Sequence, residues 1–125
     1  MQTNTDETEQ LRDLLCTVFL NMAQCFYQTQ QYQKAVEKAT LSLGFKRQSK
    51  TLFRRAQAYS ARKDYESAIK DLEEARHIEG EFGIKSSLSE MIDSELELMR
   101  VRDKQYDREI TKKMQGFLLT DRKED

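Results

Sequence analysis

The sequence predicts an all-α fold in which antiparallel helix hairpins stack on one another and a long carboxyl-terminal helix caps the stack. The 125 residues contain no proline and four glycines, so few positions break a helix. No stretch alternates apolar and polar residues over the length of a strand. A shift of 33 residues aligns the middle of the chain with itself, which is typical of a helical repeat.

The internal repeat matches residues of similar size, apart from one pair in which an alanine meets a leucine. The matched pairs are Phe19 with Leu52, Ala23 with Ala56, Phe26 with Tyr59, Tyr32 with Tyr65, Ala35 with Ala68, Ala39 with Leu72 and Ser42 with Ala75. The small Ala35 and Ala68 let the two helices of a hairpin approach closely. Because one hairpin cannot bury its apolar face alone, the units must stack.

Element boundaries follow from the turn residues and from the apolar periodicity. We expect a flexible polar amino terminus at 1–8, a first hairpin at 9–44, a second hairpin at 49–79, a long helix within 84–118 and a frayed tail at 119–125. The hairpin helices are expected at 9–28, 32–43, 49–62 and 65–78. Gly44 and Gly80 should end the second helix of each hairpin in a left-handed conformation. After a loop at 79–86, Ser87-Leu88-Ser89-Glu90 reads as a capping box.

The long helix carries an apolar stripe that is dense at first and sparse after Met99. Its members are Leu88, Met91, Ile92, Leu96, Met99, Tyr106, Ile110, Met114 and Phe117. We expect the first part to cover the open end of the stack and the second part to project into solvent.

Positive charge is concentrated in the middle of the chain. Seven cations lie between 45 and 63 with no acid among them: Lys46, Arg47, Lys50, Arg54, Arg55, Arg62 and Lys63. This run indicates an anionic partner. Nucleic acid is one interpretation, because Phe45, Phe53 and Tyr59 lie among the cations. However, Phe53 and Tyr59 fall at or beside packing positions and the arginines spread around the helix, so we expect no nucleic acid.

Several classes of protein are disfavoured. No apolar run reaches membrane-spanning length, and the first ten residues lack an apolar signal core, so we expect a cytoplasmic or nuclear protein without a membrane anchor. Cys16 and Cys25 are expected to be buried free thiols in a reducing compartment. His77 has no catalytic partner in the sequence, and no phosphate loop or metal-spaced ligand set occurs. We therefore expect no enzyme activity, no cofactor and no metal.

The repeated unit resembles the tetratricopeptide repeat family over about half of the chain. The residues are Phe19-Leu20-Asn21-Met22-Ala23-Gln24-Cys25-Phe26 with Tyr32, Ala35 and Ser42, and then Leu52-Phe53-Arg54-Arg55-Ala56-Gln57-Ala58-Tyr59 with Tyr65, Ala68, Leu72 and Ala75. The proline that the family carries after the second helix is absent from both copies. The resemblance implies a right-handed stack of hairpins that binds a peptide or another protein.

Within this family the chain is most similar to the repeat domains of co-chaperones and large immunophilins. Those domains bind the acidic carboxyl-terminal peptide of cytosolic heat-shock chaperones of the ninety- or seventy-kilodalton class through a carboxylate clamp. Asn21, Lys50 and Arg54 match three clamp positions. Two cations on one helix face beside an amide suit an aspartate side chain and a terminal carboxylate. The lysine and asparagine that the family's first repeat supplies have no counterpart here.

Two functions therefore remain open. The chain is either a chaperone adaptor that binds an acidic carboxyl-terminal peptide, or a non-catalytic scaffold subunit that docks on other protein chains. The second hypothesis follows from the missing first hairpin, which should leave apolar surface near Leu14, Leu15 and Val18 uncovered.

Overall fold

The computed structural model describes residues 2–81, 83 and 85–124, and this part of the chain is all-α. Its helices are α1 (Gln2–Gln28), α2 (Tyr32–Phe45), α3 (Ser49–Ala61), α4 (Tyr65–Glu81) and α5 (Ser87–Glu124). The predicted fold class is confirmed as helical, and the two short hairpins lie where the repeat predicts them. None of the described helices is both long and apolar enough to cross a membrane.

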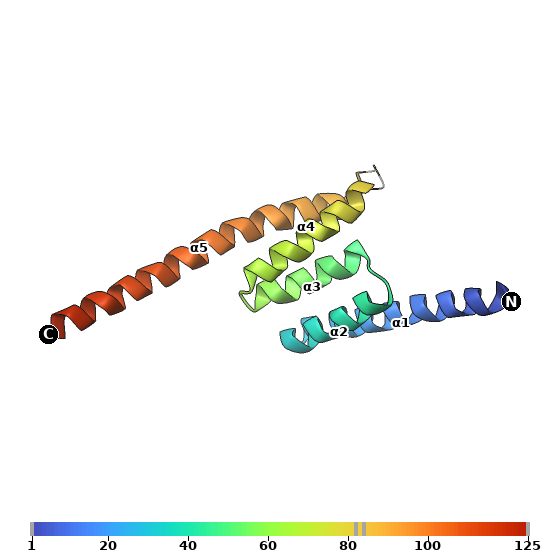
Figure 1. The fold of residues 1–125 in the computed structure, drawn as a ribbon, viewed down its shortest axis with the longest axis horizontal. Coiled ribbons are helices and arrows are strands. Elements are labelled where there is room, and N and C mark those ends of the chain that lie inside the picture. Colours follow the sequence, from blue (N-terminus) through green and yellow to red (C-terminus); the bar gives the residue numbers. More distant parts are fainter. Residues whose placement is uncertain (1, 82, 84, 125) are drawn as a thin grey trace.

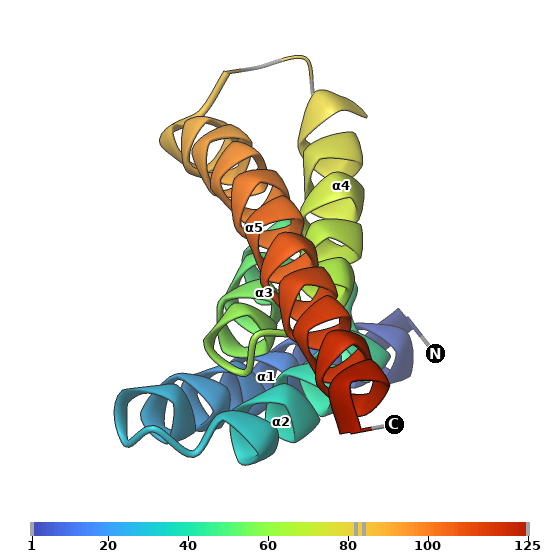
Figure 2. The same ribbon diagram turned by 90° about the vertical axis from the view of Figure 1, so that its left-hand side faces the viewer.

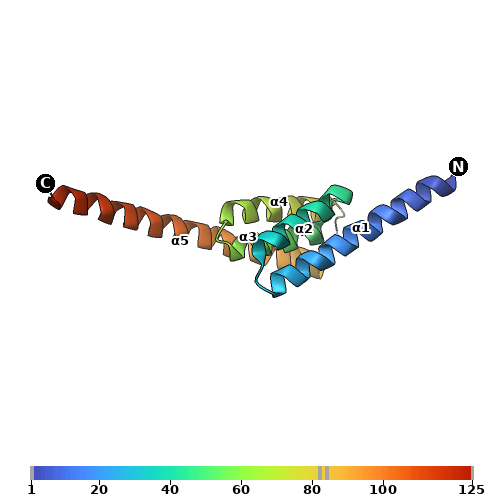
Figure 3. The ribbon, with the colours of Figure 1, turned by 90° about the horizontal axis from the view of Figure 1, so that it is seen from below.

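Successive helices run in opposite directions, and each packs on its neighbours in the sequence (Figure 1). α1 with α2 and α3 with α4 form two antiparallel hairpins, and α5 lies along α4. The view along the molecule shows the hairpin of α1 and α2 below α3, α4 and α5 (Figure 2). The start of α1 and the end of α5 extend from opposite ends of the central body (Figure 3).

The turns of the two hairpins have the same backbone geometry. Gln30 and Lys63, which are 33 residues apart, have the left-handed φ values 63° and 62°. Gln31 N–H donates to the Phe26 carbonyl at 2.8 Å, and Asp64 N–H donates to the Tyr59 carbonyl at 2.9 Å, again 33 residues apart. The sequence repeat is therefore also a repeat of backbone conformation.

The core follows the matched positions and extends into α5. Ala23, Ala35, Ala56 and Ala68 are all buried, as the close approach of paired helices requires. One continuous apolar cluster joins the end of α2 to the first part of α5: Leu43, Leu52, Phe53, Ala56, Ala68, Leu72, Ala75, Ile92, Leu96 and Met99. The first part of α5 thus covers the second hairpin as predicted, and residues 107–119 are exposed.

The ends of three helices differ from the predicted boundaries. α1 includes residues 2–8, α4 continues to Glu81, and α5 continues to Glu124, where a flexible terminus, a loop and a frayed tail were expected. The physical reason is the same in each case: the apolar stripe does not extend to these helix ends, but the chain there contains no proline, and its polar residues are compatible with a helix. The remaining residues of the predicted segments, 1, 82, 84 and 125, lie outside the described part.

The predicted glycine caps are wrong. Gly44 lies inside α2 and Gly80 inside α4, and Gly83 is the described glycine with a positive φ, at 65°. α2 ends when Lys46 turns to extended backbone, while its N–H still donates to the Ser42 carbonyl. A helix that ends in this way needs no left-handed residue.

The amino-terminal cap of α5 lies one residue earlier than predicted. Ser86 Oγ accepts a hydrogen bond from the Ser89 N–H at 3.1 Å, and the Ser89 hydroxyl donates to the Ser86 carbonyl at 3.0 Å. Ser86 is therefore the capping residue, and the predicted box from Ser87 to Glu90 is wrong. Ser86 and Ser87 are both serines that precede an apolar run, so the sequence pattern fits either of them as the capping residue.

The two cysteines have different environments. Cys16 is 2% exposed, and its sulfur lies 3.2 Å from the Ser42 hydroxyl of α2. Cys25 is exposed, so the expectation that both thiols are buried holds for Cys16 and is wrong for Cys25. The cause is the neighbouring helix: Cys25 lies on the side of α1 that no described helix covers.

Candidate peptide-binding face

Lys50 and Arg54 lie one turn apart on α3, in the middle of the basic run. Lys50 is exposed and has no ion-pair or hydrogen-bond partner in the described part of the chain. Arg54 is half-buried; it donates from Nη1 to the neutral Gln57 Oε1 at 3.1 Å and lies 6.0 Å from the Phe53 ring centroid. Both cations thus keep their charge available to an external anion.

Asn21 occupies the same position in the first repeat as Arg54 does in the second. The offset between them is the repeat length of 33 residues, and the helices that carry them, α1 and α3, contact each other directly. Asn21 is exposed and, among the described residues, has no side-chain partner. The repeat therefore directs Asn21 and Arg54 to the same side of the stack, although no hydrogen bond within residues 2–124 as described links Asn21 to Lys50 or Arg54.

Three other cations of the basic run are neutralised within the fold. Arg47 donates twice to the Glu74 carboxylate, at 2.6 Å from both Nε and Nη2. Arg55 donates twice to Asp71, at 2.7 Å, and once to the Thr40 hydroxyl at 3.2 Å. Lys46 pairs with Asp13 at 3.3 Å. The run of seven cations is thus divided between structural pairs and free charges.

Pairing shifts the pKa values of Glu74, Arg47 and Arg55. The hydrogen bonds from Arg47 lower the pKa of Glu74, and the hydrogen bond to Glu74 raises the pKa of Arg47. The hydrogen bond to Asp71 raises the pKa of Arg55, while burial opposes this rise. These arginines stabilise the fold, and their charges are not free for a partner.

The sequence reading did not identify the Arg55–Asp71 and Arg47–Glu74 pairs. A signal was present in the repeat alignment, where Arg55 stands opposite Met22 and Asp71 opposite Lys38. A charge that replaces an apolar residue at a packing position needs a partner nearby. That comparison could have separated the structural arginines from the free ones.

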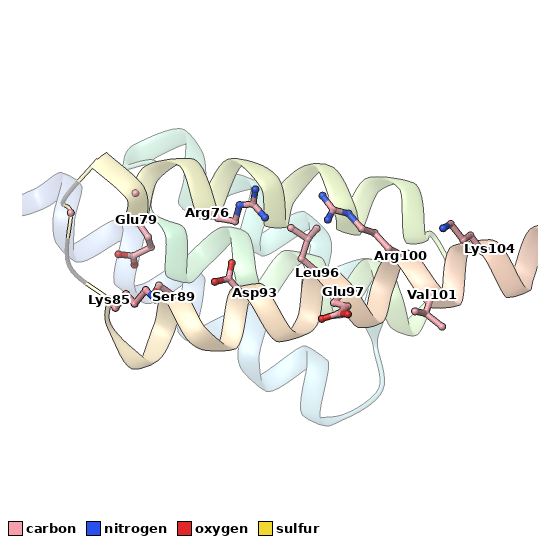
Figure 4. Close-up of a pocket in the computed structure, with 12 residues that line it drawn as sticks. Arg76, Glu79, Lys85, Ser89, Asp93, Leu96, Glu97, Arg100, Val101 and Lys104 are labelled. Atoms are coloured by element: carbon pink, nitrogen blue, oxygen red, sulfur yellow. The ribbon is translucent and has the colours of Figure 1, made fainter.

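A groove of about 780 Å³ lies between α4 and α5 (Figure 4). Leu96 forms part of its floor and is 1% exposed. The charged residues along it have both signs: Arg76, Lys85, Arg100 and Lys104 with Glu79, Asp93 and Glu97. Glu79 accepts a hydrogen bond from Ser49, and Arg100 lies 3.4 Å from Glu73. A groove of mixed charge without a free cluster of one sign favours no particular ligand.

His77 lies away from the basic run, on α4. It is exposed near the end of α4, and its Nε2 lies 3.4 Å from Glu81. Across the described ranges, no group of three or more histidine, cysteine, aspartate or glutamate side chains is placed to hold a metal ion. The surface of α1 and α3 around Asn21, Lys50 and Arg54 therefore remains the best-supported candidate site.

Comparison with known proteins adds no family assignment: the chain matches no protein-family model and no curated protein.

Proposed function

We propose that this chain is a protein-interaction module that binds the acidic carboxyl terminus of a peptide against α1 and α3. The observation that carries the proposal is that some cations in and next to α3 are paired with acids while others are not. Among the described residues, Lys50 and Arg54 have no acidic partner, whereas Arg47 and Arg55, on the same stretch of chain, are each fully paired. A pair of unpaired cations one turn apart suits a ligand with two neighbouring carboxylates.

Each member of the site has a distinct role in this proposal. Arg54 offers a planar fork that accommodates one carboxylate in two hydrogen bonds. Lys50 provides a point charge for the second carboxylate, and Asn21 provides an amide that donates to a carboxylate or a backbone carbonyl. Because Lys50 and Asn21 are exposed, each contact is weak by itself and is screened by salt.

The resemblance to the repeat domains of co-chaperones supports a specific peptide class. Their ligand ends in Met-Glu-Glu-Val-Asp, whose last residue carries both a side-chain and a terminal carboxylate. We infer a chaperone-adaptor role in the cytoplasm on this basis. Two clamp positions of that family have no counterpart in this chain, so we expect an affinity below that of a complete clamp.

Titration with a labelled Met-Glu-Glu-Val-Asp peptide, followed by fluorescence anisotropy, tests the proposal. We expect saturable binding that weakens about 10-fold or more when the terminal carboxylate is amidated, which corresponds to the loss of one charge-assisted contact. Lys50→Ala and Arg54→Ala should each weaken binding, and the affinity should fall as salt rises. Lys63→Ala, in the turn after α3, is the control and should bind as the unmodified chain does. Absence of saturable binding, or equal binding of the free and amidated peptides, would refute the proposal.

A second candidate function is a scaffold subunit that docks on other chains. It is favoured by Leu11, Leu14 and Val18, which are 55%, 59% and 42% exposed on one side of α1. Neighbouring exposed apolar side chains of this size are typical of a surface that another protein covers.

A further inference from the structure

One side of α1 is apolar and uncovered. Leu14, Val18, Met22 and Cys25 recur along it at helical spacing, and we call these four residues the outer row. Leu14 is 59% exposed and Val18 42% exposed, and Cys25 is exposed as well. Leu41 of α2 is a further exposed apolar residue of the same hairpin, at 45%.

The second hairpin shows what covers the corresponding row. The repeat offset matches Val18 with Thr51 and Cys25 with Ala58, which are 0% and 1% exposed. Ala58 is buried in one apolar cluster with Ala35 and Val36 of α2. Equivalent positions are therefore buried under a preceding second helix in one unit and exposed in the other.

The surface that α2 presents defines the chemistry of a suitable occupant. Val36 packs in the cluster of Ala58, the Thr40 hydroxyl accepts a hydrogen bond from Arg55, and Leu43 belongs to the cluster of Leu52. These α2 residues recur at i, i+4 and i+7 and are small or apolar. Val18 and Thr51 have nearly the same shape, so a helix surface that fits α3 at this position also fits α1.

The uncovered side of the first hairpin, which consists of the outer row and Leu41, is more apolar than the corresponding side of the second hairpin. Met22 stands where the second unit has Arg55, and Leu41 stands where it has Glu74. Arg55 and Glu74 are both engaged in ion pairs in the second unit. An occupant of the first unit thus meets apolar side chains at these positions and needs no charged group to pair with them.

A second copy of this chain does not offer the required helix. Its own second helices, α2 and α4, already cover α3 and α5, and the two clusters that contain Val36 and Leu43 bury the apolar residues involved. We propose that the outer row binds the second helix of a further hairpin of this repeat type, one that is distinct from the two in this chain. This occupant deepens the second candidate function and does not depend on the peptide-binding face.

A cross-linked α2 peptide provides a probe of known chemistry. It consists of residues 32–45 with a hydrocarbon staple in place of Gln33 and Glu37, which are exposed and lie on one face of α2. Cys25 is a built-in reporter, because it is the exposed thiol while Cys16 is buried. We expect the peptide to bind saturably and to slow alkylation of Cys25 by N-ethylmaleimide.

Two aspartate substitutions of matched exposure test where the peptide binds. Val18→Asp should weaken binding about 10-fold or more, as expected for loss of a central apolar contact. Val101→Asp on α5, where Val101 is 48% exposed, should leave the affinity for the α2 peptide unchanged. Circular dichroism confirms that both variants fold, and a Val36→Asp peptide should not protect Cys25.

Three results would overturn the proposal. The first is unchanged alkylation of Cys25 at high peptide concentration, and the second is an equal loss of binding in Val18→Asp and Val101→Asp. The third is an analytical ultracentrifugation experiment in which the chain alone is a dimer that Val18→Asp dissociates, since a second copy would then cover the row. The experiments distinguish failure of this proposal from failure of the proposed peptide-binding function. The Val18→Asp variant should still bind Met-Glu-Glu-Val-Asp, and the variant with Lys50→Ala and Arg54→Ala should still bind the α2 peptide.

Discussion

At the residue scale, Arg55 is a side chain that connects three helices through hydrogen bonds. It lies on α3, forms two hydrogen bonds with Asp71 of α4 and one with Thr40 of α2, and lies over the ring of Tyr59 at 5.6 Å. The side chains of Arg55 and Asp71 are 15% and 7% exposed. Removal of one partner would leave the other charge buried without compensation, which costs more than the pair gains.

Asp71→Ala should therefore lower the free energy of unfolding by about 3 kcal/mol or more. Glu74→Ala is a matched control, because it also breaks a two-bond arginine pair, but one whose side chains are 53% and 35% exposed. We expect the control to cost under about 1 kcal/mol. Urea denaturation followed by circular dichroism measures both. Equal losses in the two variants would mean that burial does not determine the strength of these pairs.

Glu74 should also influence the acid stability of the fold. Its pKa is lowered in the folded state by the hydrogen bonds from Arg47, so the folded chain favours the carboxylate more than the unfolded chain does. The resulting stabilisation is present above the ordinary glutamate pKa of about 4.3 and is lost as the pH falls through the lowered value. Glu74→Gln should be less stable than the unmodified chain at pH 7 and should converge with it below about pH 4. A stability difference that stays constant from pH 7 to pH 3 would contradict this.

The free and paired arginines illustrate what the sequence can and cannot predict at this scale. The positions of the arginines in a basic run were clear from the sequence. However, the partners of Arg55 and Arg47, which are Asp71 and Glu74, lie 16 and 27 residues away on another helix. Pairing across helices depends on the crossing of α3 and α4, which periodicity does not specify. The exposure of Cys25 was missed for the same reason, because it depends on which neighbouring helix is present.

At the element scale, the hairpin turns were easier to predict than the helix ends. The turns between α1 and α2 and between α3 and α4 fell where the repeat placed them, since both must satisfy the same backbone hydrogen bonds. The start of α1 was placed too late and the ends of α4 and α5 were placed too early, because apolar periodicity reports packing and not helix length.

The left-handed residues of the two turns lead to a paired prediction. Gln30 and Lys63 have positive φ values, which are unfavourable for residues with a Cβ atom. Gln30→Gly and Lys63→Gly should each raise the free energy of unfolding by about 0.5–1 kcal/mol, since relief of this strain exceeds the entropy that glycine loses. Lys63→Ala keeps the Cβ atom and should give no gain. Thermal melts compare the variants, and a gain at one turn with a loss at the other would argue against equivalent turns.

At the scale of the whole molecule, α5 has a packed part and a projecting part. Met99 is 1% exposed, and Tyr106 still contacts Tyr65 of α4 with ring centroids 5.9 Å apart. Beyond Tyr106 the described side chains of α5 are exposed. The division was predicted from the sequence, because the apolar stripe thins after Met99.

Truncation at two points distinguishes the packed from the projecting part. Removal of residues 110–125 should change the free energy of unfolding by less than about 0.5 kcal/mol, because the described side chains among them, those of residues 110–119, are exposed in the folded state. Removal of residues 99–125 should destabilise the fold by about 2 kcal/mol or more, since it deletes the buried Met99 and the Tyr106 contact. Urea denaturation of both forms is the measurement, and a large loss on the shorter truncation would show that the projecting part stabilises the body.

The most direct test of the proposed function compares two variants with the same change in net charge. Lys50→Glu with Arg54→Glu reverses the free cations of the candidate site, whereas Arg62→Glu with Lys63→Glu reverses two exposed cations in the turn after α3. Each variant and the unmodified chain are titrated calorimetrically with Met-Glu-Glu-Val-Asp at fixed salt. We predict that the first variant loses measurable binding and that the second binds within about 3-fold of the unmodified chain, because general attraction changes equally in both. Equal weakening in the two variants would show that net charge, and not the pair on α3, attracts the peptide.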